Sequence, residues 1–143
     1  MGAQPNRTAT KKPHVEKSYE HRSRIQKLGV KPGHRVLLVD VDDDVLRAEI
    51  RQAGGHLSAR IAGEADTIFM AAEESASLER LGQLQKHLKR DGAIWVIRPK
   101  GSAAISEADV MKAGKATGLV DVKVVRFSDT HSALKFVIPV NSR

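Results

Sequence analysis

The chain has 143 residues, enough for one domain with a single hydrophobic core. It contains no cysteine, which excludes a disulfide framework, a thiolate metal site and a thiol nucleophile. No apolar run approaches the length of a membrane span, and the N-terminus lacks the pattern of a signal peptide. We therefore expect a cytoplasmic protein that does not enter membranes.

The net charge of +7 is concentrated at the N-terminus. Residues 1–35 hold nine Lys or Arg and two Glu, whereas residues 36–143 hold fifteen Lys or Arg and fifteen Asp or Glu. A basic arm of this kind attracts anionic partners. We favour a solubilising tail over a nucleic-acid-binding arm, because fewer basic residues are clustered here than in a dedicated arm.

The N-terminal part is expected to contain a tail and one short helix. Residues 1–14 have two prolines and no apolar periodicity, which predicts a disordered tail ahead of a single domain over residues 15–143. A weakly amphipathic helix is predicted over residues 15–28, and Gly29 ends it.

The rest of the chain is organised around residues 35–55, which predict a strand, a tight turn and a helix. The apolar run 36–39 is typical of a strand buried on both faces of a parallel sheet. Apolar residues then recur at helical spacing up to Gly54, and either Asp42 or Asp43 can cap this helix. In such sheets ligands bind at the carboxyl ends of the strands, which places the aspartates of this turn where a site would be.

The later elements are predicted as strand, strand, helix, strand, helix and an antiparallel strand pair. Ser75 and Ser106 are the expected helix caps, the latter in a capping box with Asp109. A turn is expected at Asp91-Gly92, and Trp95 is expected in the core. The predicted ranges are 57–61, 66–72, 75–88, 93–99, 106–118, 120–127 and 133–140.

This order of elements resembles the class I methyltransferase fold, and the chain resembles more closely a bacterial family of unknown function with that fold. The resemblance spans residues 16–140, and His131 departs from it where an aromatic is expected. It implies a three-layer, Rossmann-like α/β sheet, mostly parallel with a C-terminal antiparallel strand pair, shortened by about one strand–helix unit. The matching segments are 27–33, 91–96, 99–100, 118–124 and 132–137.

The resemblance implies a fold and no settled activity, so no cofactor is assigned, and S-adenosylmethionine is the candidate that the methyltransferase fold suggests. Glu64 then falls where the fold has its ribose-binding acid, and Asp40, Asp42 and Lys100 would line the remaining pocket. The glycine-rich turn of the fold is, however, replaced by aspartates, with no glycine from Asp40 to Ala53. We therefore expect a non-catalytic or vestigial methyltransferase-like domain that binds a small molecule or a protein partner, with an atypical S-adenosylmethionine-dependent methyltransferase as the alternative. The sequence assigns no catalytic residue and leaves the oligomeric state open.

Other ligands are less compatible with the same turn. The missing glycines and the carboxylates disfavour NAD, FAD and P-loop nucleotides, because a phosphate needs bare backbone N–H groups. A response-regulator receiver domain would use Asp42 and Asp43 for Mg²⁺, but Ala71 stands where its phospho-accepting Asp belongs. Helix capping explains the aspartates better than a metal, so no metal site is expected.

Overall fold

The computed structural model describes residues 23–58 and 60–142. The predicted tail, residues 1–14, and the first part of the predicted helix 15–28 lie outside the described residues. Within the described part, no helix has both the length and the apolar character needed to cross a bilayer.

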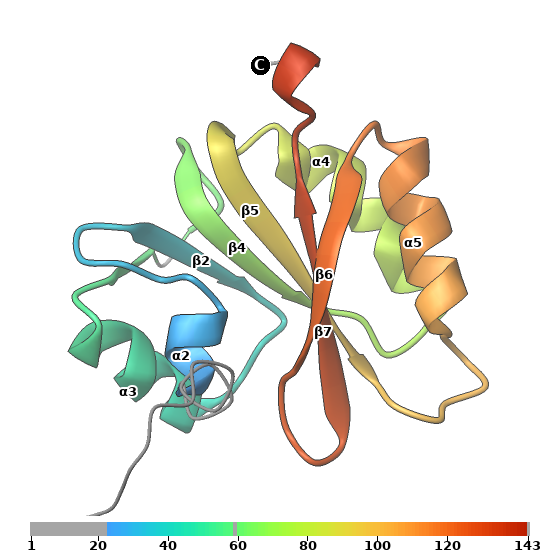
Figure 1. The fold of residues 1–143 in the computed structure, drawn as a ribbon, viewed down its shortest axis with the longest axis horizontal. Coiled ribbons are helices and arrows are strands. Elements are labelled where there is room, and N and C mark those ends of the chain that lie inside the picture. Colours follow the sequence, from blue (N-terminus) through green and yellow to red (C-terminus); the bar gives the residue numbers. More distant parts are fainter. Residues whose placement is uncertain (1–22, 59, 143) are drawn as a thin grey trace, which may run out of the picture.

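A six-stranded sheet forms the centre of the structure (Figure 1). The first four strands along the chain pair in parallel, and the last two form an antiparallel hairpin that joins the sheet through β7. This arrangement confirms the predicted, mostly parallel Rossmann-like sheet with its C-terminal antiparallel pair. In spatial order the strands are β3 (His56–Ser58), β2 (Arg35–Val39), β4 (Ala65–Ala71), β5 (Leu88–Pro99), β7 (His131–Val137) and β6 (Val120–Arg126).

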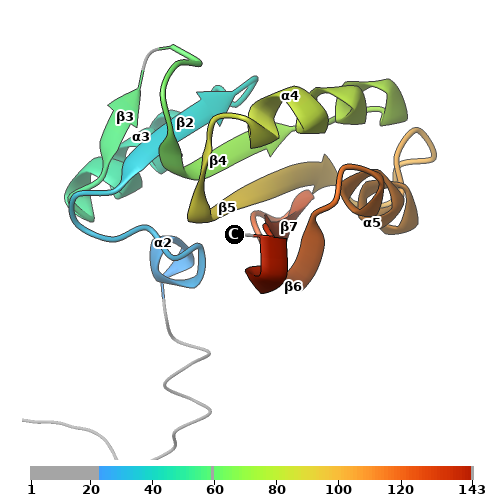
Figure 2. The same cartoon turned by 90° about the horizontal axis from the view of Figure 1, so that it is seen from above.

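Helices cover both faces of the sheet and make it the middle of three layers (Figure 2). On one face lie α2 (Arg24–Lys27) and α3 (Asp44–Gln52), and on the other lie η2 (Ser75–Arg80), α4 (Leu81–Gln85) and α5 (Glu107–Ala116). A short 3-10 helix, η3 (Val140–Ser142), follows β7.

Each face of the sheet has its own core. The α3 face buries Trp95 and Phe69 against Leu46 and Ile50, whereas the opposite face buries Phe136 among the leucines of η2 and α4. Full burial of such side chains contributes roughly 1.5–3 kcal/mol each, which anchors the strands and helices that carry the loops.

The predicted helix over residues 75–88 is wrong in its last three residues, 86–88, which are not helical. The 3-10 turns of η2 lead into α4, which ends at Gln85, and Leu88 is already the first residue of β5. Leu88 has the spacing of the leucine stripe, but it pairs with Ala65 of β4. Ser75 does not cap this helix, because the N-cap position belongs to Glu74. The side chain of Glu74 makes no capping hydrogen bond.

The turn predicted at Asp91-Gly92 is also wrong, since both residues lie inside β5. The pairing with β4 jumps there from Ala65↔Leu88 to Thr67↔Ala93, so the extra residues form an irregularity in the strand. A Cβ on Gly92 would lie 2.7 Å from the Asp66 carbonyl oxygen, which explains a glycine at this close approach.

The second predicted strand, residues 57–61, is shorter than expected and ends at Ser58. The Arg35 guanidinium explains the early end, because it donates to the Ser58 hydroxyl at 2.9 Å and to the Glu64 carbonyl at 2.7 Å. These hydrogen bonds turn the chain back toward the start of β4. As a result, β3 stops opposite Leu37, before β2 reaches its carboxyl end at Val39.

Candidate site at the carboxyl ends of the strands

The carboxyl ends of β2, β4 and β5 meet the β6–β7 hairpin around a cavity of about 260 Å³, here called the carboxyl-end pocket. The strand order reverses between β2 and β4, which is where open α/β sheets bind ligands. The lining residues are Asp40, Val41, Asp42, Asp43, Ala71, Glu73, Ile97, Phe127, Ser128 and His131.

Asp40, directly after β2, has a left-handed backbone with φ of 59°. Every other positive φ in the described chain belongs to glycine. Such a conformation is costly for an L-residue, although aspartate tolerates it better than most, and strain of this kind gathers at functional sites. The carboxylate of Asp40 forms an ion pair with Arg80 at the end of η2. Asp40 is therefore fixed at the pocket in both backbone and side chain.

The other aspartates of the turn divide into one structural and two exposed residues. Asp43 is the N-cap of α3 and accepts a hydrogen bond from the Leu46 amide at 2.9 Å, which confirms one of the two predicted caps. Asp42 and Asp44 have side chains that are 98% exposed, and both lie within 3.2 Å of Arg47. Asp42 is the one of these two that lines the pocket.

Glu73 and His131 face each other across the pocket. His131 Nε2 lies 3.2 Å from Glu73 Oε2, and the other ring nitrogen lies 2.8 Å from the Thr130 hydroxyl. Glu73 follows β4 and His131 opens β7, so the pair joins the parallel part of the sheet to the hairpin. An imidazole beside a carboxylate can hold or transfer a proton.

The structure brings two of the four predicted site residues together. Asp40 and Asp42 line the carboxyl-end pocket. Lys100 follows β5 at the same end of the sheet, where its backbone N–H donates to the Thr130 carbonyl at 2.9 Å, but it is not among the described lining residues. Glu64 lies at the opposite end, directly before β4, beside Arg35 at the start of β2.

Four further residues line the pocket that were not predicted as site residues: Glu73, Phe127, Ser128 and His131. Glu73 carried a usable signal, because it follows a buried strand at its carboxyl end. The other three depend on the insertion of β7 beside β5, which no local pattern encodes. Among the residues that the structure places, no three His, Asp or Glu side chains are grouped so that they could hold a metal ion.

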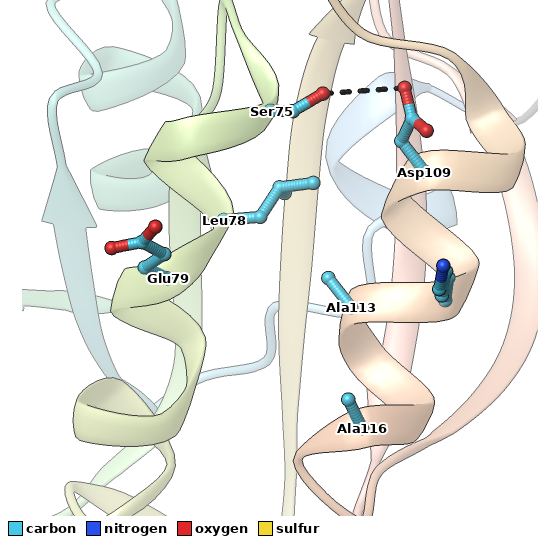
Figure 3. A pocket seen from close by; sticks show the side chains of 7 residues that line it. Ser75, Leu78, Glu79, Asp109, Ala113 and Ala116 are labelled. Atoms are coloured by element: carbon cyan, nitrogen blue, oxygen red, sulfur yellow. Dashed lines mark hydrogen bonds between the residues drawn. The ribbon is translucent and has the colours of Figure 1, made fainter.

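A second cavity, of about 390 Å³, lies between η2 and α5 (Figure 3). Leu78, Ala113 and Ala116 give it apolar walls, and the Ser75 hydroxyl lies 3.3 Å from Asp109 Oδ2 at one end. The backbone N–H of Ser106, followed by its hydroxyl, lowers the pKa of Asp109, so this carboxylate serves the capping box of α5. Ser75 and Asp109 are thus engaged at the start of α5, and the remaining polar lining residues, Glu79 and Lys112, come from different helices.

Solved methyltransferase structures are similar to this fold. A SAM dependent methyltransferase from Aquifex aeolicus superposes with a TM-score of 0.64 at 16% identity, over 80% of this chain and 87% of that one. A ribosomal protein L11 methylase from Lactobacillus delbrueckii subsp. bulgaricus gives a TM-score of 0.63 at 15% identity, over 80% and 74%. The tRNA methyltransferase TrmK of B. subtilis gives 0.61 at 12% identity, over 81% and 65%. At these identities the likeness shows the fold alone.

A comparison with curated protein sequences finds no match. A family profile does match, over residues 25–140, and this range takes in every strand of the sheet and the whole carboxyl-end pocket. The chain belongs to the family described as "Protein of unknown function (DUF3052)", and it has a methyltransferase-like fold.

Proposed function

We propose that the carboxyl-end pocket binds a small ammonium-bearing molecule and that the domain does not transfer methyl groups. The observation that carries this proposal is the set of exposed carboxylates around the pocket. The side chains of Asp40, Asp42 and Glu73 are each at least 64% exposed, and they face one cavity. Asp40 and Asp42 also pair with Arg80 and Arg47, but neither arginine lines the cavity. A concave site lined by one sign of charge concentrates ligands of the opposite sign.

The size of the pocket favours a small ligand. Its volume of about 260 Å³ is smaller than the roughly 300–1,000 Å³ of pockets that enclose drug-sized molecules. Val41, Ile97 and Phe127 supply apolar walls beside the carboxylates. A compact cation with a few methyl or methylene groups matches this combination.

The residues present do not fit a complete S-adenosylmethionine. The cofactor requires a backbone that it can approach closely, and here Asp40 occupies the left-handed position with a side chain. The corner beyond β3 has no acid to hold a ribose, because residues 59–63 are Ala, Arg, Ile, Ala and Gly, and Glu64 lies at the other end of the sheet. The pocket also lacks the volume for both halves of the cofactor.

The second candidate function is S-adenosylmethionine-dependent methyl transfer. Two observations favour it: the solved structures with this fold include a SAM dependent methyltransferase, and the ammonium and sulfonium of the cofactor are themselves cations that suit Asp40 and Asp42. We rank it second because it needs the adenosine half to bind where the described residues offer no ribose acid.

The proposal is tested with choline and with the uncharged alcohol in which carbon replaces the nitrogen of choline. Thermal unfolding and NMR titration of the full chain should show binding of choline but not of the alcohol, because only the cation is attracted by the carboxylates. Glu73→Gln and Asp42→Asn should each weaken binding, whereas Asp129→Asn, outside the pocket, should not. Equal responses to choline and the alcohol, or equal binding by all three variants, would contradict the proposal.

A further inference from the structure

Lys123 of β6 and Lys135 of β7 are directly opposite each other in the antiparallel pair. Like charges in this arrangement destabilise a sheet. Lys135 is in turn opposite Trp95 of β5, and its ammonium lies 5.9 Å from the centre of the indole ring. Both lysines therefore belong to the sheet face that α2 and α3 cover only in part.

A bulge in β6 creates this pairing. The register begins at Val120↔Val137 and Asp121↔Phe136 and then skips one residue, so that Lys123 is opposite Lys135. Uninterrupted pairing would have put Val122 there and turned Lys123 to the other face. Bulges at functional sites often change the direction in which a side chain points. This bulge places two lysines opposite each other, which lowers the stability of the strand pair.

A third lysine joins this pair from the segment after α2. Burial of Lys135, together with the positive charges of Lys123 and Lys31, lowers the pKa of the Lys135 ammonium. None of the ion pairs found among the described residues involves these three lysines. Within residues 23–58 and 60–142, no ion pair therefore compensates the charge of this cluster.

The cluster continues toward the tip of the hairpin. A cavity of about 260 Å³ between α2 and the β6–β7 turn is lined by Arg24, Lys27, Arg126, Phe127, Ser128 and Asp129. The Arg24 guanidinium lies 4.5 Å above the Phe127 ring, which holds α2 beside the hairpin (Figure 1). Arg24 is paired with Glu49 and Arg126 with Asp129, whereas Lys27 has no carboxylate among the described ion pairs. We call Lys27, Lys31, Lys123 and Lys135 the basic face.

We propose that the basic face binds nucleic acid through its phosphate backbone. The cations are distributed over α2, the following segment and two strands, which matches a ligand with regularly repeated negative charges. All of them are lysines, which bind phosphates as point charges.

The surroundings favour nucleic acid over an acidic protein. Large exposed apolar side chains in the described part are all aliphatic, so the lysines have no exposed aromatic anchor of the kind that centres a protein interface. The same lack of exposed aromatic rings leaves no platform for base stacking. Binding should therefore depend on phosphates and be indifferent to sequence.

The test measures fluorescence anisotropy of a labelled single-stranded RNA and of a DNA duplex with the full chain. If about four phosphates are neutralised, affinity for RNA should fall about 50-fold between about 50 and 200 mM salt. Lys123→Glu should weaken binding at least tenfold at low salt. It should not lower the melting temperature, because Glu opposite Lys135 replaces a like-charge pair with an opposite-charge pair.

Lys115→Glu is the matched control, since it changes the net charge equally and lies on α5, on the other face of the sheet. It should reduce binding much less than Lys123→Glu. Equal weakening by both variants, or no binding of either nucleic acid at low salt, would overturn the proposal. Binding to phosphatidylserine vesicles that Lys123→Glu abolishes, without nucleic-acid binding, would assign the face to anionic lipid and also overturn it.

Discussion

The carboxylate of Asp43 accepts a hydrogen bond from the Leu46 amide at 2.9 Å and closes the N-terminus of α3 from within the protein. In nucleotide-binding folds of similar architecture, the free amides at this helix start receive a phosphate. Here an aspartate already occupies the position, and its negative charge complements the helix dipole. The same interaction thus stabilises the fold and repels phosphate from the carboxyl-end pocket.

Replacing Asp43 with alanine should lower the free energy of unfolding by about 1 kcal/mol, which is typical for the loss of an N-cap. Asp42→Ala is the matched control, because its side chain is 98% exposed and does not cap the helix. Denaturant unfolding of both variants, with and without millimolar Mg²⁺, checks the prediction. We expect no response to Mg²⁺. A rise in the wild-type free energy of unfolding with Mg²⁺ that both variants lose would show that the aspartates form a metal site.

Gly114 should be required for the contact between α5 and the sheet. A Cβ on this residue would lie 2.2 Å from Phe136 Cε1, so Gly114→Ala must displace a fully buried ring. Overpacking of this kind typically costs about 1–3 kcal/mol. In Gly82→Ala, by contrast, the new Cβ would be 3.8 Å from Thr117, and stability should rise by up to about 1 kcal/mol because alanine favours a helix. Equal unfolding free energies for the two variants would refute the packing argument.

Asp66 should make stability depend on pH in the acidic range. Burial raises the pKa of its carboxyl group, but the Arg35 N–H at 2.8 Å and the Lys89 ammonium at 3.2 Å outweigh burial and lower the pKa below its usual value. A carboxyl with a lowered pKa in the folded state stabilises the fold above the unfolded pKa of about 4, and this contribution is lost as the pH falls toward the folded value.

The stability difference between wild type and Asp66→Asn should therefore shrink as the pH is lowered from about 6 to about 3. Asp121→Asn, an exposed residue of β6 without an ion pair among the described contacts, serves as the control and should follow the wild-type pH profile. Urea unfolding at several pH values measures all three proteins. A difference that stays constant across this range would refute the assigned role of Asp66.

The parts of the fold that depend on local sequence were predictable. The apolar run 36–39 gave β2, and the capping box of Ser106 and Asp109 marked the start of α5 with Ile105 and Val110 buried beside it. Leu88 was misassigned because its spacing from Leu84 fits the apolar stripe of a helix, although Leu88 is in fact the first residue of a buried strand. Its partner Ala65, which decides between the two, lies more than twenty residues away.

The candidate sites depend on how the strands pair, and the hydrophobic periodicity of the sequence does not reveal that pairing. Glu73 and His131 are 58 residues apart and meet because β7 inserts between β5 and β6. Lys123 and Lys135 share a face only because β6 bulges between Asp121 and Lys123. The overall charge of residues 36–143 is zero, so composition could not reveal that part of its positive charge is gathered on one face.

Calorimetric titration tests directly whether the carboxyl-end pocket holds S-adenosylmethionine. S-adenosylmethionine and S-adenosylhomocysteine should be titrated into the wild type and into Asp40→Asn, which removes the charge and keeps a residue that tolerates the left-handed backbone. We expect no saturable binding of S-adenosylhomocysteine and at most weak, charge-dependent binding of S-adenosylmethionine. Micromolar binding of both molecules to the wild type, abolished by Asp40→Asn, would show that the pocket is a cofactor site.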